Sequence, residues 1–212
     1  MSDLVSIIKD IQRATGADVD GVFGIQSARR VLNALQSVAG VEITHPREEE
    51  TLAGGEGELD ERTIKNILTL DARLRDRMIH FALLANATAA TFGCRYVMTD
   101  GNRSLAGQEA IYAQGRTVPG KIVSYAKPGQ SWHNLKAAGD FGVFRGKAYL
   151  DQTDPAAAER VHLACAAHAK ACGLTAGAYW KKQDLPHYQA AELADSPKAA
   201  DRAKFKEKGS VL

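Results

Sequence analysis

The order of the strand-like and helix-like segments after residue 70 is the feature that most limits the possible folds. Runs rich in β-branched and aromatic residues predict a strand at 94–99 and a hairpin across 139–150, turning at Arg145-Gly146. Further strand-like residues lie at 178–180 and 187–189. Helical periodicity predicts helices at 71–93, 105–115 and 155–173. Strands and helices do not alternate regularly, which favours an α+β fold with a small antiparallel sheet and flanking helices over a doubly wound sheet.

Residues 1–70 have a different pattern, in which short predicted helices flank the glycine-rich turn GADVDGVFGIQS. The stretch DGVFGIQSARRVL aligns with the later stretch EGELDERTIKNIL, which indicates an internal repeat. The first copy resembles the turn that leads into a helix in small peptidoglycan-binding modules. The matching residues are Asp20, Gly21, Phe23, Gly24 and Ser27. A glycine turn with an N-cap serine in any helical hairpin would give the same pattern.

Composition limits the class of protein. The 212 residues carry 27 Lys and Arg against 25 Asp and Glu, a net charge of +2, so nothing indicates a nucleic-acid partner. No apolar run is long enough to span a membrane, and the segment MSDLVSIIKDIQ lacks the features of a secretory signal peptide. We expect a monomer that is made in the cytoplasm and does not insert stably into a membrane. The three cysteines predict buried thiols rather than a disulfide framework.

Two short stretches, SWHNLKAAGD and DLPHYQ, contain residue types that bind metal ions. They supply the histidines His133 and His187 and the aspartates Asp140 and Asp184. Two imidazoles and one carboxylate form a known catalytic zinc set with water in the fourth position, and a second carboxylate serves such a site as general base. Pro186 disfavours a helix, so a bend is needed to aim Asp184 and His187 at one point. Spacing alone leaves the roles of the two aspartates open.

A second group of metal-binding residue types lies on one face of the predicted helix at 155–173. Its members are Cys165, His168 and Cys172. Val161 shares this face and no fourth ligand accompanies the group, so we interpret it as part of the core.

Together, the two stretches resemble the zinc peptidases that cut D-Ala-D-Ala or L-Ala-D-Glu bonds in peptidoglycan. The family pattern is S-x-H-x-x-G-x-A-x-D, followed later by (D/E)-x-x-H, and this chain departs from it at Lys136, where the family usually has glycine. The upstream segment RSLAGQ resembles the family's R-S-x-x-x-Q segment, and Trp180 also resembles a family position. The resemblance covers residues 95–190. The matching residues are Arg103, Ser104, Gln108, Ser131, His133, Ala138, Asp140, Asp184 and His187.

The resemblance implies roles for these residues. His133, Asp140 and His187 would hold Zn²⁺, Asp184 would act as general base and then general acid, and Arg103 would stabilise the oxyanion. The implied substrate-binding residues are Ser131, Gln108 and Trp180.

We therefore expect three parts: a wall-binding helical domain at 1–70, a zinc peptidase domain at 71–195 and a basic polar tail at 196–212. The segment GRTVPGKIVSYAKPGQSWHN resembles the endolysin-type branch of the family. The predicted function is a phage endolysin that reaches the cell wall after release and cuts the L-Ala-D-Glu bond of peptidoglycan. Two alternatives stay open: a D-Ala-D-Ala carboxypeptidase or dipeptidase, and a non-catalytic wall-binding protein on the same scaffold.

Overall fold

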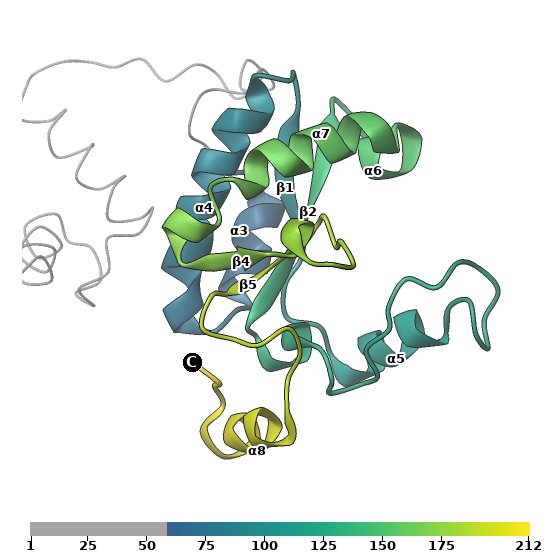
Figure 1. The fold of residues 1–212 in the computed structure, drawn as a ribbon, viewed down its shortest axis with the longest axis vertical. Coiled ribbons are helices and arrows are strands. Elements are labelled where there is room, and N and C mark those ends of the chain that lie inside the picture. Colours follow the sequence, from purple (N-terminus) through teal and green to yellow (C-terminus); the bar gives the residue numbers. More distant parts are fainter. Residues whose placement is uncertain (1–58) are drawn as a thin grey trace, which may run out of the picture. The chain divides into compact units, whose positions relative to one another are not determined.

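The computed structural model describes residues 59–212 of the chain. This part combines one small antiparallel sheet with flanking helices, so the predicted α+β fold is confirmed (Figure 1). The predictions for residues 1–58, which include the helical wall-binding domain and the first copy of the repeat, lie outside the described residues. No helix between residues 59 and 212 is long and apolar enough to cross a membrane.

The sheet places four strands side by side and adds a short fifth. The order is β1 (Arg95–Asp100), β2 (Ala138–Arg145), β5 (His187–Ala190) and β4 (Leu174–Ala176), with β3 (Ala148–Tyr149) paired to the end of β2. All these pairs are antiparallel. Strands that are far apart in the sequence, β2 and β5, are therefore neighbours at the centre of the sheet.

Several helices surround this sheet. α4 (Ala72–Ala90) packs against both β1 and α7 (Pro155–Ala166), and α6 (Leu150–Thr153) joins β3 to α7. Figure 1 shows α5 (Leu105–Ala113) and the loop after it extending away from the sheet as an arm. Near the C-terminus lies α8 (Ala199–Lys208). The predicted basic tail is thus largely helical, and Val211 beyond it is buried in a small cluster with Trp132 and Leu135.

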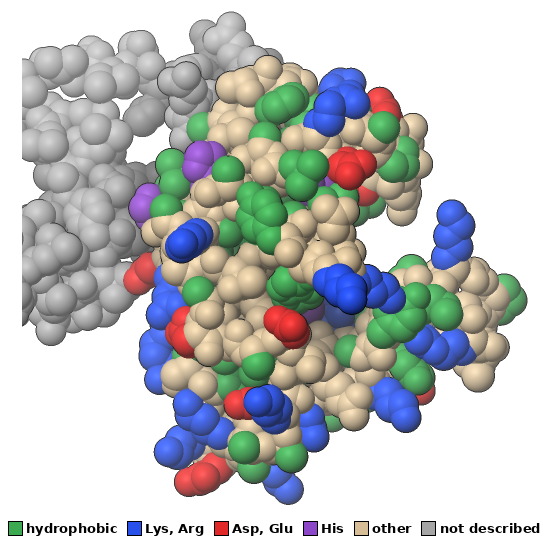
Figure 2. Space-filling view, in the orientation of Figure 1, with side chains coloured by type: hydrophobic (Ala, Val, Ile, Leu, Met, Phe, Trp, Pro, Cys, Tyr) green, Lys and Arg blue, Asp and Glu red, His purple; other side chains and the backbone are tan. Residues whose placement is uncertain are grey.

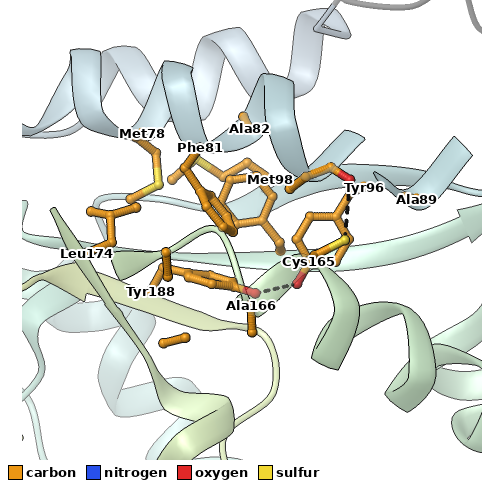
Figure 3. Close-up of a cluster of buried hydrophobic side chains, with 14 of the residues drawn as sticks. Met78, Phe81, Ala82, Ala89, Tyr96, Met98, Cys165, Ala166, Leu174 and Tyr188 are labelled. Carbon is orange, nitrogen blue, oxygen red and sulfur yellow. Dashed lines mark hydrogen bonds between the residues drawn. The ribbon is translucent and has the colours of Figure 1, made fainter. Parts of the chain in front are cut away.

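An aromatic cluster fills the space between α4, α7 and the sheet. Phe81 of α4 contacts Phe141 and Tyr188 at ring-centroid distances of 5.4 and 4.2 Å, and Phe141 stacks on Tyr96. The Tyr96 and Tyr188 hydroxyls are 2.8 Å apart (Figure 3). Because side chains alternate along a strand, the inward position of Tyr188 directs its neighbour His187 to the opposite face of the sheet.

α3 (Glu61–Leu68) covers the free edge of β1. Thr63 Oγ1 accepts a hydrogen bond from the Met98 amide, and Asn66 donates to the Met98 carbonyl. Ile67 and Leu70 are buried in the same core as α4. The described unit therefore begins before residue 71, where the sequence analysis placed the domain boundary, because these side chains pair the exposed edge of the sheet and bury apolar area against it.

Several local predictions differ from the structure. The segment at 178–180 is not a strand: β4 ends before it, and the chain continues in the 3₁₀ helix η3 (Gly177–Tyr179). The helix expected at 155–173 ends at Ala166, and a separate 3₁₀ turn, η2 (Lys170–Cys172), follows. The predicted second hairpin strand is shortened to two residues because Leu150 is buried as the first residue of α6.

Lys136 has a left-handed backbone conformation, with φ of 58°, and is the only non-glycine residue with positive φ in residues 59–212. It ends the 3₁₀ helix η1 (Trp132–Leu135), and its carbonyl accepts a hydrogen bond from Asp71. Glycine adopts this conformation without the steric conflict of a Cβ atom. Glycine, which the family pattern has here, suits this backbone geometry, and this chain adopts it with a lysine.

Replacing this lysine should stabilise the protein. We expect Lys136→Gly to raise the free energy of unfolding by roughly 0.5–1 kcal/mol, because relief of the left-handed strain exceeds the entropy that glycine adds to the unfolded chain. Urea unfolding followed by circular dichroism measures the change. Lys147→Gly, in a hairpin turn where φ is negative, is the matched control and should lower stability. Equal effects of the two substitutions would contradict the strain argument.

Candidate metal centre

The pairing of β2 with β5 brings the first two site residues together. Asp140 and His187 are direct partners in the antiparallel register. Phe141 and Tyr188, the next residue on each strand, point into the aromatic cluster, so Asp140 and His187 lie on the other face. An aspartate and a histidine that are distant in sequence thus become nearest neighbours through the sheet alone.

His133 reaches the same point from η1. Ser131 caps this 3₁₀ helix by accepting a hydrogen bond from the His133 amide at 3.3 Å. The His133 carbonyl accepts from the Arg103 amide, and Asn134 donates to the Arg103 carbonyl at 2.9 Å. The histidine loop and the loop that follows β1 therefore hold each other in place.

Three potential ligand atoms converge. His133 Nε2 lies 3.1 Å from Asp140 Oδ1 and 3.3 Å from His187 Nδ1, and the last two atoms are 3.3 Å apart. Among the described residues, this is the group of histidine, cysteine and acidic side chains that could hold a metal ion. The predicted three-residue set is thus brought together, and its nitrogen, nitrogen and oxygen donors suit a divalent transition metal.

The outward-facing nitrogens of both histidines have acceptors. His133 Nδ1 lies 2.8 Å from the Gly101 carbonyl, and His187 Nε2 lies 3.0 Å from Gln189 Oε1. The Gln189 amide nitrogen donates to the Ala194 carbonyl, which fixes the oxygen towards His187. Since a carbonyl oxygen only accepts, each ring carries its proton on the outer nitrogen. When the rings are neutral, the inner nitrogens present lone pairs to Asp140, an arrangement that a cation stabilises.

Asp184 is placed by a turn. The His187 amide donates to the Asp184 carbonyl at 3.1 Å, with Leu185 and Pro186 between them, so the predicted bend is present. The Asp184 amide in turn donates to the Gly177 carbonyl. A Cβ atom on Gly177 would lie 2.5 Å from the Asp184 carbonyl oxygen and 3.2 Å from His187 Cβ. Only glycine permits this approach.

Burial and mutual charge shift the pKa values of the site. Burial alone would raise the pKa of Asp140, but the imidazoles of His133 and His187 hold it well below its usual range. Burial would lower the pKa of His187, yet its hydrogen bond to Asp140 raises it. The pKa of Asp184 is raised by burial and by the nearby Asp140 carboxylate. Asp184 is an exposed residue, so its carboxyl can exchange protons with solvent or with a bound substrate.

Arg103 lies beside the three ligand atoms and is held on several sides. Its Nε donates to Asp100 at 2.7 Å, Nη2 donates to Asp100 and to Asp140 Oδ2, and Nη1 donates to Gln108 at 3.0 Å. Gln108 is fully buried, and its amide nitrogen donates to Ser124 and to the Ala126 carbonyl. The structure thus places Gln108 as a support of Arg103 and not at the surface.

The two other expected substrate-binding residues lie close to the histidines. Ser131 caps η1, and the Trp180 ring lies 5.0 Å from the His187 ring and is partly exposed. Sequence reasoning missed Asp100, Asn134, Gly177 and Gln189 as parts of the site. Of these, Gln189 had a usable signal, since it stands two positions after His187 on the same strand and so shares its face.

The second group of metal-binding residue types belongs to the core. Cys165 and Cys172 are buried as free thiols, and His168 Nε2 lies 2.7 Å from Thr88 Oγ1. Burial raises the pKa of Cys165 to about 12, which keeps the thiol protonated.

Comparison with known proteins supports the resemblance that the motifs predict. The chain is 34% identical over 108 residues to the peptidoglycan L-alanyl-D-glutamate endopeptidase CwlK of Bacillus subtilis (strain 168). The matched region is 49% of this chain and 65% of CwlK, so the chain spans just under two thirds of that relative. A solved structure, the Serratia marcescens L-Ala D-Glu endopeptidase ChiX, matches 68% of this chain and 93% of its own, with 20% identity and a TM-score of 0.40. No family model matches the chain.

The orientation of His187 yields a prediction. Gln189→Met removes the acceptor for the outer N–H of His187, so we expect affinity for a divalent metal ion, with Zn²⁺ as the probe, to fall roughly 10- to 100-fold. Gln189→Glu keeps an acceptor at the same place and should retain affinity. Titration against a chromophoric chelator measures both. Gln183→Met is the control, since its amide bonds to the Ala178 carbonyl in the exposed loop before Asp184. Unchanged zinc affinity in Gln189→Met would contradict the assigned hydrogen bond.

Proposed function

We propose that this protein is a zinc-dependent peptidoglycan hydrolase that cuts the L-Ala-D-Glu bond of the stem peptide. The observation that carries the proposal is the convergence of His133 Nε2, Asp140 Oδ1 and His187 Nδ1, with Asp184 in the turn directly before His187. Similarity to CwlK, whose name states this activity, supports the choice of bond. The nitrogen and oxygen donor set supports zinc among the divalent ions, since it leaves an open position for water.

The residues of the site suit amide hydrolysis. When bound, zinc supplies Lewis-acid activation of a water molecule. Asp184, whose raised pKa lies nearer neutrality than that of an ordinary aspartate, takes the proton of that water and returns it to the leaving nitrogen. The Arg103 guanidinium lies beside Asp140, and its positive charge stabilises the oxyanion that forms on the carbonyl under attack. Trp180 forms an apolar wall beside His187.

The biological setting is part of the same proposal. The endolysin-like segment before His133 supports a phage lysis enzyme that acts on the cell wall, and the wall-binding role of the part of the chain before α3 rests on the motif at Asp20–Ser27. The near-balanced charge supports a protein that does not bind nucleic acid, and we propose that it works as a monomer.

Digestion of purified peptidoglycan tests the reaction and its metal requirement together. We expect mass spectrometry to detect new D-Glu amino ends, their loss after treatment with a chelator and their return on addition of Zn²⁺. Release of terminal D-Ala alone would instead assign the carboxypeptidase or dipeptidase activity. Binding to the wall without any cleavage would assign the non-catalytic function.

Substitution of the proposed base separates catalysis from metal binding. Asp184→Asn keeps the shape of the side chain but cannot take a proton, so we expect kcat to fall by roughly 10²- to 10⁴-fold with zinc affinity nearly unchanged. Steady-state cleavage of a stem peptide and a parallel zinc titration provide the two readouts. Asp195→Asn, an exposed acid after β5, is the control and should leave both unchanged. A large loss of zinc affinity in Asp184→Asn would make Asp184 a ligand instead.

A further inference from the structure

A lysine and a tyrosine from two segments that each adjoin site residues in the sequence are in contact. Lys182 Nζ lies 3.1 Å from the centroid of the Tyr125 ring, and both residues are exposed. Lys182 forms no ion pair with a carboxylate in the described part of the chain. An ammonium on an aromatic face is attracted by the ring and keeps its other N–H groups available as donors.

Both partners of this contact lie next to the site along the chain. Lys182 stands between Trp180, whose ring lies against His187, and Asp184. On the other segment, Tyr125 follows Ser124, which accepts a hydrogen bond from Gln108. Gln108 in turn holds Arg103 beside Asp140. The contact between Lys182 and Tyr125 therefore joins the two segments that flank the ligand atoms.

Two arginines of the same region have partners of their own. Arg103 is held by Asp100, Asp140 and Gln108, and Arg116 lies 3.9 Å from the Tyr112 ring centroid. In Figure 2, basic side chains gather where the α5 arm faces the body of the protein. Lys182 is thus held in place by a ring while its charge remains unneutralised.

The substrate under the proposed function carries a matching group. In the stem peptide, D-Glu is linked onwards through its side-chain carboxyl, so its α-carboxylate stays free on the carbon attached to the scissile nitrogen. An amide carbonyl placed at the ligand atoms thus brings a carboxylate within a few bonds of the site. We propose that Lys182, held on Tyr125, binds this carboxylate and selects stem peptides in which it is not amidated. This inference rests on the proposed function and names its specificity-determining residue.

Two synthetic stem peptides test it: one with γ-linked D-Glu and a free α-carboxylate, the other identical but with an α-carboxamide. We expect Lys182→Met to lower kcat/KM for the free acid by about tenfold or more, the size of a lost charge-assisted hydrogen bond. For the carboxamide, the change should stay within about twofold. Lys182→Arg should keep most of the preference, and Tyr125→Leu should lose part of it. Lys181→Met, the adjacent exposed lysine, is the matched control and should behave as wild type.

The outcomes separate this inference from the proposed function. Wild-type cleavage of the free acid with no selective loss in Lys182→Met would overturn the inference alone. Equal losses on both peptides, or a selective loss in Lys181→Met, would also overturn it. Cleavage of neither peptide by wild type would overturn the proposed function and the inference with it. Lys182→Gln provides a second neutral variant, and thermal unfolding of each variant identifies any loss that is due to misfolding.

Discussion

The antiparallel pairing of β2 with β5 is the interaction on which the site depends. It sets Asp140 opposite His187, and the alternation of side chains directs both to one face while Phe141 and Tyr188 enter the core on the other. A slip of β5 by one residue would turn its side chains to the opposite face, so His187 would enter the aromatic cluster while Asp140 stayed on the other side of the sheet. The register is therefore fixed twice, by the apolar core on one side and by the polar contacts of the site on the other.

The core side of this pairing includes a polar network of its own. The Tyr188 hydroxyl contacts that of Tyr96, which lies 2.7 Å from His162 Nδ1, and His162 Nε2 lies 2.7 Å from Asp151. Asp151 also accepts from the Val143 amide on β2. Burial raises the pKa of Tyr96 well above its ordinary value, so its hydroxyl stays protonated and available as a donor. Such a network favours a single packing arrangement of β5, and this also fixes the position of His187 on the opposite face of that strand.

Much of the site could be predicted from the sequence because its reactive groups are side chains, and these side chains stand at the spacing of the family motifs. His133, Asp140 and His187 converge, and the bend before His187 is present. The hydrogen bonds that orient the site residues could not be predicted in the same way, because one partner in each is a backbone atom. His133 bonds to the Gly101 carbonyl, and Gln189 bonds to the Ala194 carbonyl. Backbone groups are the same at every residue, so only the folded chain shows which of them serve the site.

The fold was predictable to a similar depth and for a similar reason. Helical periodicity identified α4, which buries an apolar face, and β-branched and aromatic residues identified β1 and β5. It missed the role of α3, whose contribution is polar: Thr63 and Asn66 pair with the backbone of β1, which no hydrophobic pattern reveals.

α3 also supports the metal centre from outside. Thr69, the residue that ends this helix, accepts a hydrogen bond from the Asn102 amide, and a Cβ atom on Gly101 would lie 2.6 Å from the Asn66 carbonyl oxygen. The Gly101 carbonyl accepts from His133. The contacts at the end of α3 therefore hold the loop after β1 in the position where the Gly101 carbonyl orients His133. A helix assigned by sequence to a separate domain is, by these contacts, part of the frame that holds the metal-binding residues.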